Sequence, residues 1–590
     1  MCGILAIIGK NAKAEKYEES MKRLHNRGPE GERWLKKGGA LLGFTRLAIN
    51  GLTDQGMQPM ERGACAWAVN GEIYNWATLN TENSLGCETG SDCEVVGALY
   101  TRIYAGRPIE EIGDLFNSLD GVFATVIIDS DRGVAIVARD PFGVRPLYMG
   151  YDGESILFAS EMKSLEAVCE NVEPFPPSTV AVYNLMNTSD ITYAKRYHKV
   201  STTTMPLLSN VELSAGAIRV ALTVAVKKRM MMERPVAVLL SGGLDSSLVA
   251  SLVARELKEA GRPALKTFSI GMAGSSDLFH AKMVADWIGS DHTEIVVTPE
   301  EMFGAISSVI YHIESYDTTT VRASVGNWLV SKAVKERSEC KVVFNGDGSD
   351  EVFGSYLYFY EAPSAREYEE EVLRLLAEIH SFDVLRSDRS ISSNGLEPRT
   401  PFLDKAFVQT VLSIPLKYRM PRKGGVCEKW ILRRAFDDGK TLPAEVLWRR
   451  KEAFSDGVSG TEKSWYQIVQ ETVADRVPAD WKEMAAKKYG VNTPTTAEMY
   501  YYRSCFEGFY GAKHVTTTVP HFWMPKWTGA TDPSARTLAI YSDTEGSTGG
   551  VGASLNASVV DASLNASAVD ASLSESGKGC DDAPLGASAV

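Results

Sequence analysis

Short apolar runs mark residues 1–199 and are separated by Gly, Asn and Asp. They cover residues 2–8, 41–49, 66–69, 122–129, 134–138 and 156–158. Runs of this length with turn-forming residues between them are typical of strands in layered, largely antiparallel sheets. The pattern therefore predicts an α+β domain over residues 1–199, with antiparallel sheets and a few helices.

The pattern changes after a Ser- and Thr-rich stretch at residues 200–212, which has the composition of a linker. Beyond it, apolar strands alternate with helical patterns. The strands are expected at residues 236–240, 267–271, 293–297 and 342–345, and the helices at residues 246–259 and 278–288. Such alternation predicts a parallel sheet covered on both faces, so we assign an α/β domain to residues 213–535.

Residues 536–590 have a third composition. Ala-Ser-Leu-Asn occurs at Ala553 and again at Ala562, and Ala-Ser-Leu follows at Ala571. Units this small and polar cannot bury a core, so they predict a disordered, low-complexity tail.

The formal net charge of −13 over 590 residues argues against nucleic acid or an anionic membrane as a partner, because both need a basic face. No apolar run approaches the roughly 18 residues of a membrane span, and no leader pattern opens the sequence. The nine cysteines include no Cys-x-x-Cys pair, as expected in a reducing compartment. We therefore expect a soluble, cytoplasmic protein that acts on small molecules.

Cys2 becomes the terminal residue once the initiator Met is removed. A terminal cysteine carries its own general base, since its α-amine, with a pKa of about 7.7–8.0, can take the thiol proton. Taken alone, Cys2 is better explained as an early core residue. The motifs that follow it change this interpretation.

Three further segments offer groups that fit a free amino acid with a side-chain amide. Arg46 offers a guanidinium that could hold a carboxylate in a bidentate pair. Asn70 and Gly71 offer the side-chain amide and the N–H group of an oxyanion hole, and Asp92 could hold an α-ammonium. Each segment alone is a common turn, but together they indicate a glutamine site.

A second kind of chemistry begins at residues 241–247, Ser-Gly-Gly-Leu-Asp-Ser-Ser, directly after an apolar strand. Backbone N–H groups and hydroxyls at a helix N-terminus bind phosphate, and Asp245 offers a hard oxygen for Mg²⁺. The segment lacks the lysine of a Walker A loop. It therefore suits release of pyrophosphate from ATP better than transfer of the γ-phosphoryl group.

The same strand-to-turn pattern returns at residues 343–351, where Asp350 could complete the Mg²⁺ site. Lys451 could neutralise phosphate charge, and the segment 316–324 offers hydroxyls and a cation for a carboxylate substrate. Any one of these charges in isolation is better explained as a solvated surface.

With Arg27-Gly28-Pro29, Arg139-Asp140-Pro141-Phe142-Gly143 and Ser160-Glu161-Met162-Lys163, the N-terminal motifs resemble a class II glutamine amidotransferase domain. Up to the tail, the chain resembles the glutamine-hydrolysing asparagine synthetase family. The matching segments are FSIG (268–271), SSDL (275–278), VIYHIESYDTTTVRAS (309–324), GSDEVFG (348–354), RTPFLDK (399–405) and KEAFSDGV (451–458).

The resemblance implies a role for each motif residue. Cys2 would be the nucleophile, and ammonia would pass from it through an internal tunnel to a β-aspartyl-AMP intermediate. Glutamine would contact Arg46, Leu47, Ala48, Ile49, Asn50, Asn70, Gly71, Glu72 and Asp92. ATP would contact Leu240, Ser241, Gly242, Gly243, Asp245, Ser246, Ile270, Asn345, Gly346 and Lys451. Aspartate would lie near Thr319, Arg322 and Asp347, and Mg²⁺ would bind to Asp245 and Asp350. The assembly considered is a homodimer.

Two positions depart from the family pattern. Glu30 stands where the family usually has Asp, and we expect only a small geometric effect. Asp347 stands where the family usually has a catalytic Glu. The shorter side chain retracts the carboxylate by about 1.5 Å, and misplacement on this scale can cost roughly 100-fold in rate.

We interpret the chain as an enzyme that makes asparagine from aspartate, glutamine and ATP. A synthetase for another carboxylate, such as a β-lactam-forming relative, typically lacks the terminal-cysteine chemistry. A phosphoribosyl pyrophosphate amidotransferase shares the stretch 139–147 but needs no Ser-Gly-Gly-Leu-Asp-Ser-Ser segment. A third alternative is a regulatory or filament-forming protein that has lost catalytic turnover. Only Asp347 supports it, and the retention of Cys2, Asp245 and Asp350 argues against it.

Overall fold

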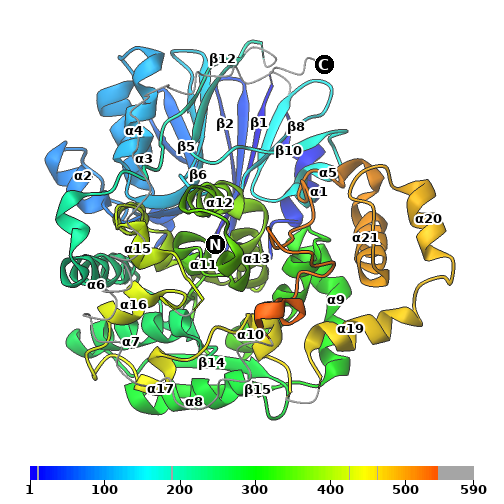
Figure 1. Ribbon diagram of the computed structural model, residues 1–590. Coiled ribbons are helices and arrows are strands. Elements are labelled where there is room, and N and C mark those ends of the chain that lie inside the picture. Colours follow the sequence, from blue (N-terminus) through cyan, green and yellow to red (C-terminus); the bar gives the residue numbers. More distant parts are fainter. Residues whose placement is uncertain (10–11, 188–190, 424, 461–462, 542–590) are drawn as a thin grey trace, which may run out of the picture.

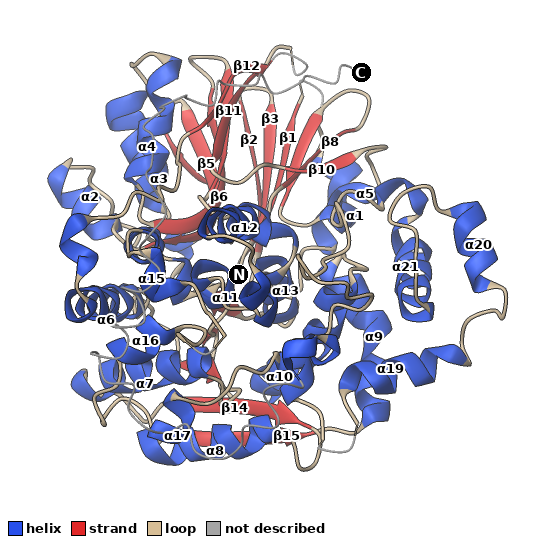
Figure 2. Ribbon diagram, viewed as in Figure 1, coloured by secondary structure: helices blue, strands red, loops and turns tan. Residues whose placement is uncertain are grey.

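Two six-stranded antiparallel sheets form the N-terminal domain of the computed structural model, which describes residues 1–9, 12–187, 191–423, 425–460 and 463–541 (Figures 1 and 2). The first sheet has the order β10-β8-β9-β1-β3-β2 and the second β12-β11-β7-β6-β5-β4. Their strands are β1 (Gly3–Ile8), β2 (Glu32–Lys37), β3 (Ala40–Thr45), β4 (Met60–Arg62), β5 (Cys65–Ile73), β6 (Gly121–Asp129), β7 (Val134–Arg139), β8 (Tyr148–Tyr151), β9 (Ile156–Ala159), β10 (Val172–Pro174), β11 (Thr179–Asn184) and β12 (Ile191–Arg196).

Helices cover the outer face of each sheet, which explains why β1 is apolar at every position. Side chains alternate across a strand. Ile4 and Ala6 therefore join the core between the two sheets, while Leu5 and Ile7 pack beneath the outer helices. These helices are α1 (Glu18–Lys22) and α5 (Met162–Glu166) on the first sheet, and α2 (Trp76–Glu82), α3 (Glu94–Leu99) and α4 (Ile112–Ser118) on the second.

The second domain is built on a five-stranded parallel sheet with the order β15-β14-β13-β16-β17. Its strands are β13 (Val236–Leu239), β14 (Lys266–Gly271), β15 (Asp291–Val296), β16 (Val342–Phe344) and β17 (Glu397–Arg399). The carboxyl ends of parallel strands meet at one edge of a sheet, which is where open α/β sheets bind ligands. The turns after β13 and β16, at residues 240–243 and 345–348, therefore lie side by side.

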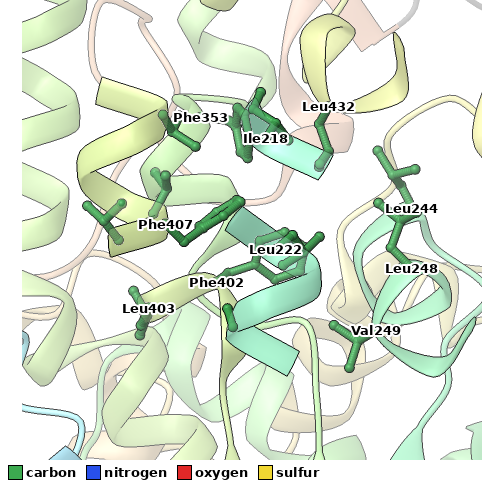
Figure 3. Packing of buried hydrophobic residues seen from close by; sticks show 14 of the residues in the cluster. Ile218, Leu222, Leu244, Leu248, Val249, Phe353, Phe402, Leu403, Phe407 and Leu432 are labelled. Carbon is green, nitrogen blue, oxygen red and sulfur yellow. The ribbon is translucent and has the colours of Figure 1, made fainter. Parts of the chain in front are cut away.

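The helices of the second domain pack around this sheet or, like α20 and α21, stand to one side of it (Figure 2). They are α6 (Val211–Lys228), α7 (Leu244–Glu259), α8 (Ser276–Ile288), α9 (Pro299–Ile313), α10 (Thr318–Arg337), α11 (Ser349–Phe353), α12 (Ala365–Glu378), α13 (Asp383–Ser392), α14 (Lys405–Leu412), α15 (Leu416–Arg419), α16 (Trp430–Ala435), α17 (Ala444–Leu447), α18 (Phe454–Gly457), α19 (Trp465–Ala474), α20 (Trp481–Lys488) and α21 (Ala497–Tyr510). Leu222 of α6, Leu248 of α7, Phe402 and Phe407 belong to one buried cluster, and Figure 3 shows Leu222 beside Phe402. This core fixes α7, whose N-terminus follows the turn after β13.

The fold confirms the predicted α+β domain followed by a parallel α/β domain. The apolar run at 41–49 is the main difference: β3 ends at Thr45, and residues 46–49 leave the sheet to line a pocket. The expected linker ends inside α6, which begins at Val211. Residues 542–590, with the repeats of the expected tail, lie outside the described residues. Within the described ranges, no helix has both the length and the hydropathy that a membrane crossing requires.

Candidate active sites

Cys2 lies at the start of β1 and faces a pocket in the N-terminal domain. The Leu47 N–H donates to its Sγ at 3.4 Å, and the thiol lies 3.5 Å from the Leu47 carbonyl oxygen. Burial raises the pKa of this thiol above its usual range, so it needs a base nearby. The pocket is lined by Cys2, Arg46, Leu47, Ala48, Ile49, Asn50, Gly71, Glu72, Asp92, Cys93 and Glu397, among others.

Asn70 and Gly71 lie within β5 and show the features expected of an oxyanion hole, and Gly71 lines the pocket. The Asn70 side chain is buried, and within the described residues neither its Nδ2 nor its Oδ1 has a hydrogen-bond partner. An unpaired buried amide is costly, so this group indicates a ligand that would complete it. A side chain at Gly71 would meet the Val122 carbonyl oxygen at 2.1 Å, so only glycine fits this approach of the strands.

Acidic groups also line the pocket. Asn50 Nδ2 donates to Glu72 at 2.8 Å, and the Ile73 N–H donates to Asp92 at 2.7 Å. Burial raises the pKa of Glu72 well above its usual range, and burial raises that of Asp92 to about 6. Arg399, which belongs to β17 of the second domain, lies 3.2 Å from Glu72 and keeps one positive charge beside the carboxylates. Such an environment favours a further cation, such as an α-ammonium.

The loop that carries Arg46 is held by both domains. The Arg46 guanidinium donates to the carbonyl oxygens of Thr53 at 2.9 Å and Gly51 at 2.5 Å. Glu30 accepts the Ala48 N–H at 2.8 Å, so the longer acid at this position has a definite partner. Arg234 of the second domain donates to the Ala48 carbonyl oxygen at 2.8 Å and pairs with Glu30 at 3.0 Å.

The second cavity opens at the carboxyl ends of β13, β14 and β16. It is lined by Leu240, Ser241, Gly243, Asp245, Ser246, Ile270, Thr319, Asn345, Gly346, Asp347, Asp350, Lys451 and further residues. Gly242 lies in the same turn with a φ of +71°, and a side chain there would meet the Ala281 amide nitrogen at 2.4 Å. The Ser241 and Ser246 hydroxyls are 3.0 Å apart at the start of α7, where N–H groups attract an anion.

Asp245 and Asp350 converge on one cation. The Nζ atom of Lys429 lies 2.5 Å from Asp245 and 2.6 Å from Asp350, and Lys451 Nζ lies 2.6 Å from the other oxygen of Asp350. Burial opposes the charge on Asp350, but the two lysines prevail and hold its pKa well below the usual range. The sequence motifs contain no signal for Lys429. It immediately precedes α16, far along the chain from both aspartates.

Asp347 belongs to a second charged group in the same cavity. Arg386, on α13, lies 3.0 Å from Asp347 and 2.6 Å from Asp383. Tyr356 donates to Glu351 and, at 3.1 Å, to Asp383. Sequence reasoning missed Arg386 and Asp383, because they lie on a helix without a glycine-bearing turn.

Arg322 does not reach this cavity, although the sequence placed it near aspartate. Its guanidinium forms bidentate pairs with Glu498 at 2.8 and 2.5 Å, and with Asp532 at 2.8 Å to each oxygen. One turn earlier, Thr319 does line the cavity, and its buried hydroxyl has no hydrogen-bond partner among the described residues. α10 therefore presents Thr319 to the cavity and turns Arg322 toward the C-terminal segment.

Comparison with known proteins assigns a family to each domain. The family described as "Glutamine amidotransferase domain" matches residues 1–216, and "Asparagine synthase" matches residues 217–375 and 361–524. The chain is 40% identical over 569 residues to "Asparagine synthetase [glutamine-hydrolyzing]" of Gallus gallus, covering 92% of this chain and 99% of that protein. The Homo sapiens protein of the same name gives the same identity and coverage. The Rattus norvegicus protein is 39% identical over 572 residues, covering 92% of this chain and 100% of that protein.

Proposed function

Because this chain belongs to the glutamine-hydrolysing asparagine synthetase family, we propose a role for each of its two cavities in one reaction. The enzyme makes asparagine from aspartate with nitrogen from glutamine, and ATP is a substrate. The pocket at Cys2 releases ammonia, and the cavity between the turns after β13 and β16 activates aspartate. One observation carries this division: Cys2 and the Asp245–Asp350 pair lie in different cavities, one in each domain.

At the first site, the Cys2 thiolate attacks the side-chain amide of glutamine and forms a thioester, which water then hydrolyses to glutamate. The α-amine freed by removal of Met1 takes the thiol proton and returns it to the departing ammonia. Asn70 Nδ2 and the Gly71 N–H stabilise the oxyanion. Arg46 holds the α-carboxylate, while Glu72 and Asp92 hold the α-ammonium, and the segment 47–50 encloses the substrate.

At the second site, the turn at residues 241–243 and Ser246 hold the phosphates of ATP, and Leu240, Ile270, Asn345 and Gly346 contact the nucleotide. The aspartate β-carboxylate attacks the α-phosphorus, which gives β-aspartyl-AMP and releases pyrophosphate. Lys451 neutralises charge on the departing pyrophosphate. Thr319 and the charged group around Asp347 face the aspartate. An aspartate contact from Arg322 stays a prediction that requires its pairs with Glu498 and Asp532 to open.

The residues of the second site fit a magnesium ion. No group of three or more His, Cys, Asp or Glu side chains in the described ranges could hold a metal on its own. Mg²⁺ is, however, usually bound by one or two carboxylates together with substrate phosphates. Asp245 and Asp350 already place an oxygen each around a single cation, the Lys429 ammonium. With ATP present, these two carboxylates would hold Mg²⁺, which supplies charge neutralisation at the phosphates.

Product analysis tests the proposed function. With aspartate, ATP and Mg²⁺, we expect asparagine, AMP and pyrophosphate when either glutamine or ammonia is added, and glutamate only with glutamine. Glutamate without AMP or asparagine would contradict the proposal for the second site. If ATP is cleaved only when another carboxylate is supplied, that carboxylate, and not aspartate, is the substrate.

Two further assignments belong to the same proposal. We place the enzyme in the cytoplasm, which is supported by the free thiols of all eight cysteines in the described ranges. A homodimer, the assembly considered from the sequence, stays a prediction that light scattering on the purified protein would decide. Transfer of ammonia through an internal tunnel likewise stays a proposal, and competition by added ¹⁵N-ammonia during glutamine-dependent synthesis tests it.

A further inference from the structure

The segment that carries Lys451 has little regular structure of its own. Residues 451–453 form no helix, strand or turn, and α18 is a single turn that begins at Phe454. Seven consecutive residues, 449–455, line the nucleotide cavity. The position of this loop, residues 449–457, therefore depends on side-chain contacts with other parts of the chain.

On the cavity side, Asp350 and Ser276 contact the loop. Lys451 Nζ lies 2.6 Å from Asp350, and the Ser276 hydroxyl donates to Glu452 at 2.8 Å. The first of these contacts must rearrange when phosphates or a metal arrive, because Asp350 is also the proposed Mg²⁺ ligand. Arg449, at the start of the loop, is held separately by its pair with Asp277 at 3.0 Å and by the Arg433 bond to its carbonyl oxygen at 2.9 Å. The part of the loop after Lys451 has fewer contacts of this kind, so an anchor outside the cavity would help to position it.

On the far side, the last described residues of the chain contact the loop at both ends. The Arg450 guanidinium donates to the Tyr541 carbonyl oxygen at 2.7 Å and lies 4.7 Å from the centre of the Tyr541 ring. Arg536 donates to the Asp456 carbonyl oxygen at 3.2 Å, and its guanidinium lies 3.9 Å from the carboxylates of Asp456 and Glu452. Ser534 donates to Asp456 at 3.3 Å.

This terminal segment is itself firmly anchored. Asp532 pairs with the buried Arg322 of α10 through both oxygens and also accepts a hydrogen bond from Gln470 at 2.9 Å. Leu538 and Ile540 are buried in the main core of the second domain. In Figure 1 the orange end of the described chain lies over α10, in agreement with the Arg322 pair. These anchoring contacts thus lie apart from the cavity, while Ser534, Arg536 and Tyr541 of the same segment contact the loop.

Building on the function proposed above, we propose that residues 532–541 form a C-terminal latch that positions the 449–457 loop, with Arg536 as its main positioning residue. Arg536 does not touch the cavity. It acts through the backbone and the carboxylate of Asp456, and so sets where Lys451 meets the phosphates. Burial raises the pKa of Asp456 to about 6 while Arg536 opposes this rise, so the pair also keeps a buried carboxylate ionised near neutral pH.

The latch predicts a defect confined to the second site when Arg536 is lost. Arg536→Ala should lower kcat/KM for ATP in aspartate-dependent pyrophosphate release about tenfold, since misplacing a catalytic group by 1 Å can cost roughly 100-fold. Glutaminase activity should stay within about twofold of wild type, because among the described residues the pocket at Cys2 and the cavity that the loop lines have no lining residue in common. Arg536→Lys should recover part of the rate, since it keeps the charge beside Asp456 but not the planar guanidinium.

Two matched controls separate the latch from general effects. Arg434→Ala removes an exposed arginine that pairs with Asp437, and a chain ending at Tyr541 removes only residues 542–590. Both should behave as wild type in each half-reaction. A rate of pyrophosphate release by Arg536→Ala equal to that of Arg434→Ala would overturn the proposal. A parallel loss of glutaminase activity would also overturn it, because the segment would then support the whole fold.

Limited trypsin digestion tests the latch without relying on the proposed reaction. Arg450 and Lys451 are tryptic sites within the loop, so we expect faster cleavage there in Arg536→Ala than in wild type or Arg434→Ala. Unchanged cleavage would overturn the latch even if wild type makes asparagine. If the wild type releases no pyrophosphate but Arg536→Ala is still cleaved faster than wild type, the proposed function is contradicted and the latch is kept.

A double variant tests whether Arg536 acts through Lys451. In a Lys451→Met background, Arg536→Ala should add little further loss of kcat, and an additive loss would contradict a route through Lys451.

Discussion

At the residue scale, Asp347 is the position where we expect a substitution to change how well the enzyme uses ammonia from glutamine. Its carboxylate lies 3.0 Å from Arg386 and lines the cavity. Asp347→Glu extends the carboxylate by about 1.5 Å and restores the family's side chain. We expect the ratio of asparagine to glutamate formed from glutamine to rise several-fold, up to roughly 100-fold if reach is the whole limitation.

Asp347→Ala, measured in parallel, should stop adenylate formation or its capture by ammonia. A lower ratio in Asp347→Glu than in wild type would show that the shorter acid is matched to its neighbours, Arg386 above all.

Asp92 gives the glutamine site a pH dependence. Burial raises the pKa of Asp92 to about 6, above its ordinary value, so this carboxylate is ionised at neutral pH and becomes protonated as the pH falls through 6. The proposed contact with the α-ammonium of glutamine needs the ionised form, so affinity is highest well above pH 6 and is lost as the pH falls through 6. Glu72, Glu397 and Arg399 face the same space, and burial raises the pKa of Glu72 as well.

We expect the Kd of glutamine to rise about tenfold between pH 7 and pH 5, measured by calorimetry in a Cys2→Ala variant so that catalysis does not contribute. Asp92→Asn should bind more weakly at pH 7 and show a shallower pH dependence. A Kd that is constant over this range would contradict the role of Asp92.

At the element scale, the sequence predicted the strands well because burial on both faces leaves a continuous apolar run, as in β1 and β6. It also placed the turns after β13 and β16, since Gly242 and Gly346 mark backbone that allows no side chain. Lys429 and Arg386 could not be predicted in the same way. Their roles depend on how α16 and α13 pack against the sheet, and packing between distant segments leaves no local pattern. The pairs that Arg322 forms could not be predicted for the same reason, since its partners Glu498 and Asp532 are remote in the sequence.

The short segment before β13 is an element whose role follows from its contacts. Arg234 donates to the Ala48 carbonyl oxygen, and Glu233 accepts the Gly51 N–H at 2.6 Å, so the second domain braces the glutamine loop. Arg234 is partly exposed, so its contacts contribute about 1 kcal/mol. Arg234→Met should therefore raise KM for glutamine about fivefold and leave ammonia-dependent synthesis unchanged. Steady-state kinetics with each nitrogen source test this, with the exposed Arg255→Met as a control that should alter neither.

At the scale of the whole molecule, the two proposed sites serve different half-reactions, and strand β17 contacts both of them. Glu397 of this strand lines the Cys2 pocket, and Arg399 contacts Glu72 through its side chain while its carbonyl oxygen accepts the Asn345 N–H at 3.2 Å. A single strand of the second domain therefore touches both sites. The two half-reactions should be separable by mutation even though their frameworks share this strand.

Cys2→Ala and Asp245→Asn test that separation from opposite sides. Cys2→Ala removes the proposed nucleophile, so glutamine-dependent synthesis should vanish while ammonia-dependent synthesis stays close to wild type. Asp245→Asn removes a proposed metal ligand from the second site only, so AMP formation should stop while glutamine hydrolysis continues. Assays of glutamate, AMP and asparagine on both variants check the pattern, with near-equal melting temperatures as evidence that each is folded.

If Cys2→Ala also lost ammonia-dependent synthesis in a folded protein, the pocket at Cys2 would control the second site directly. β17, with Glu397 at one pocket and Arg399 bonded to the turn of the other, would then be the route by which it does so.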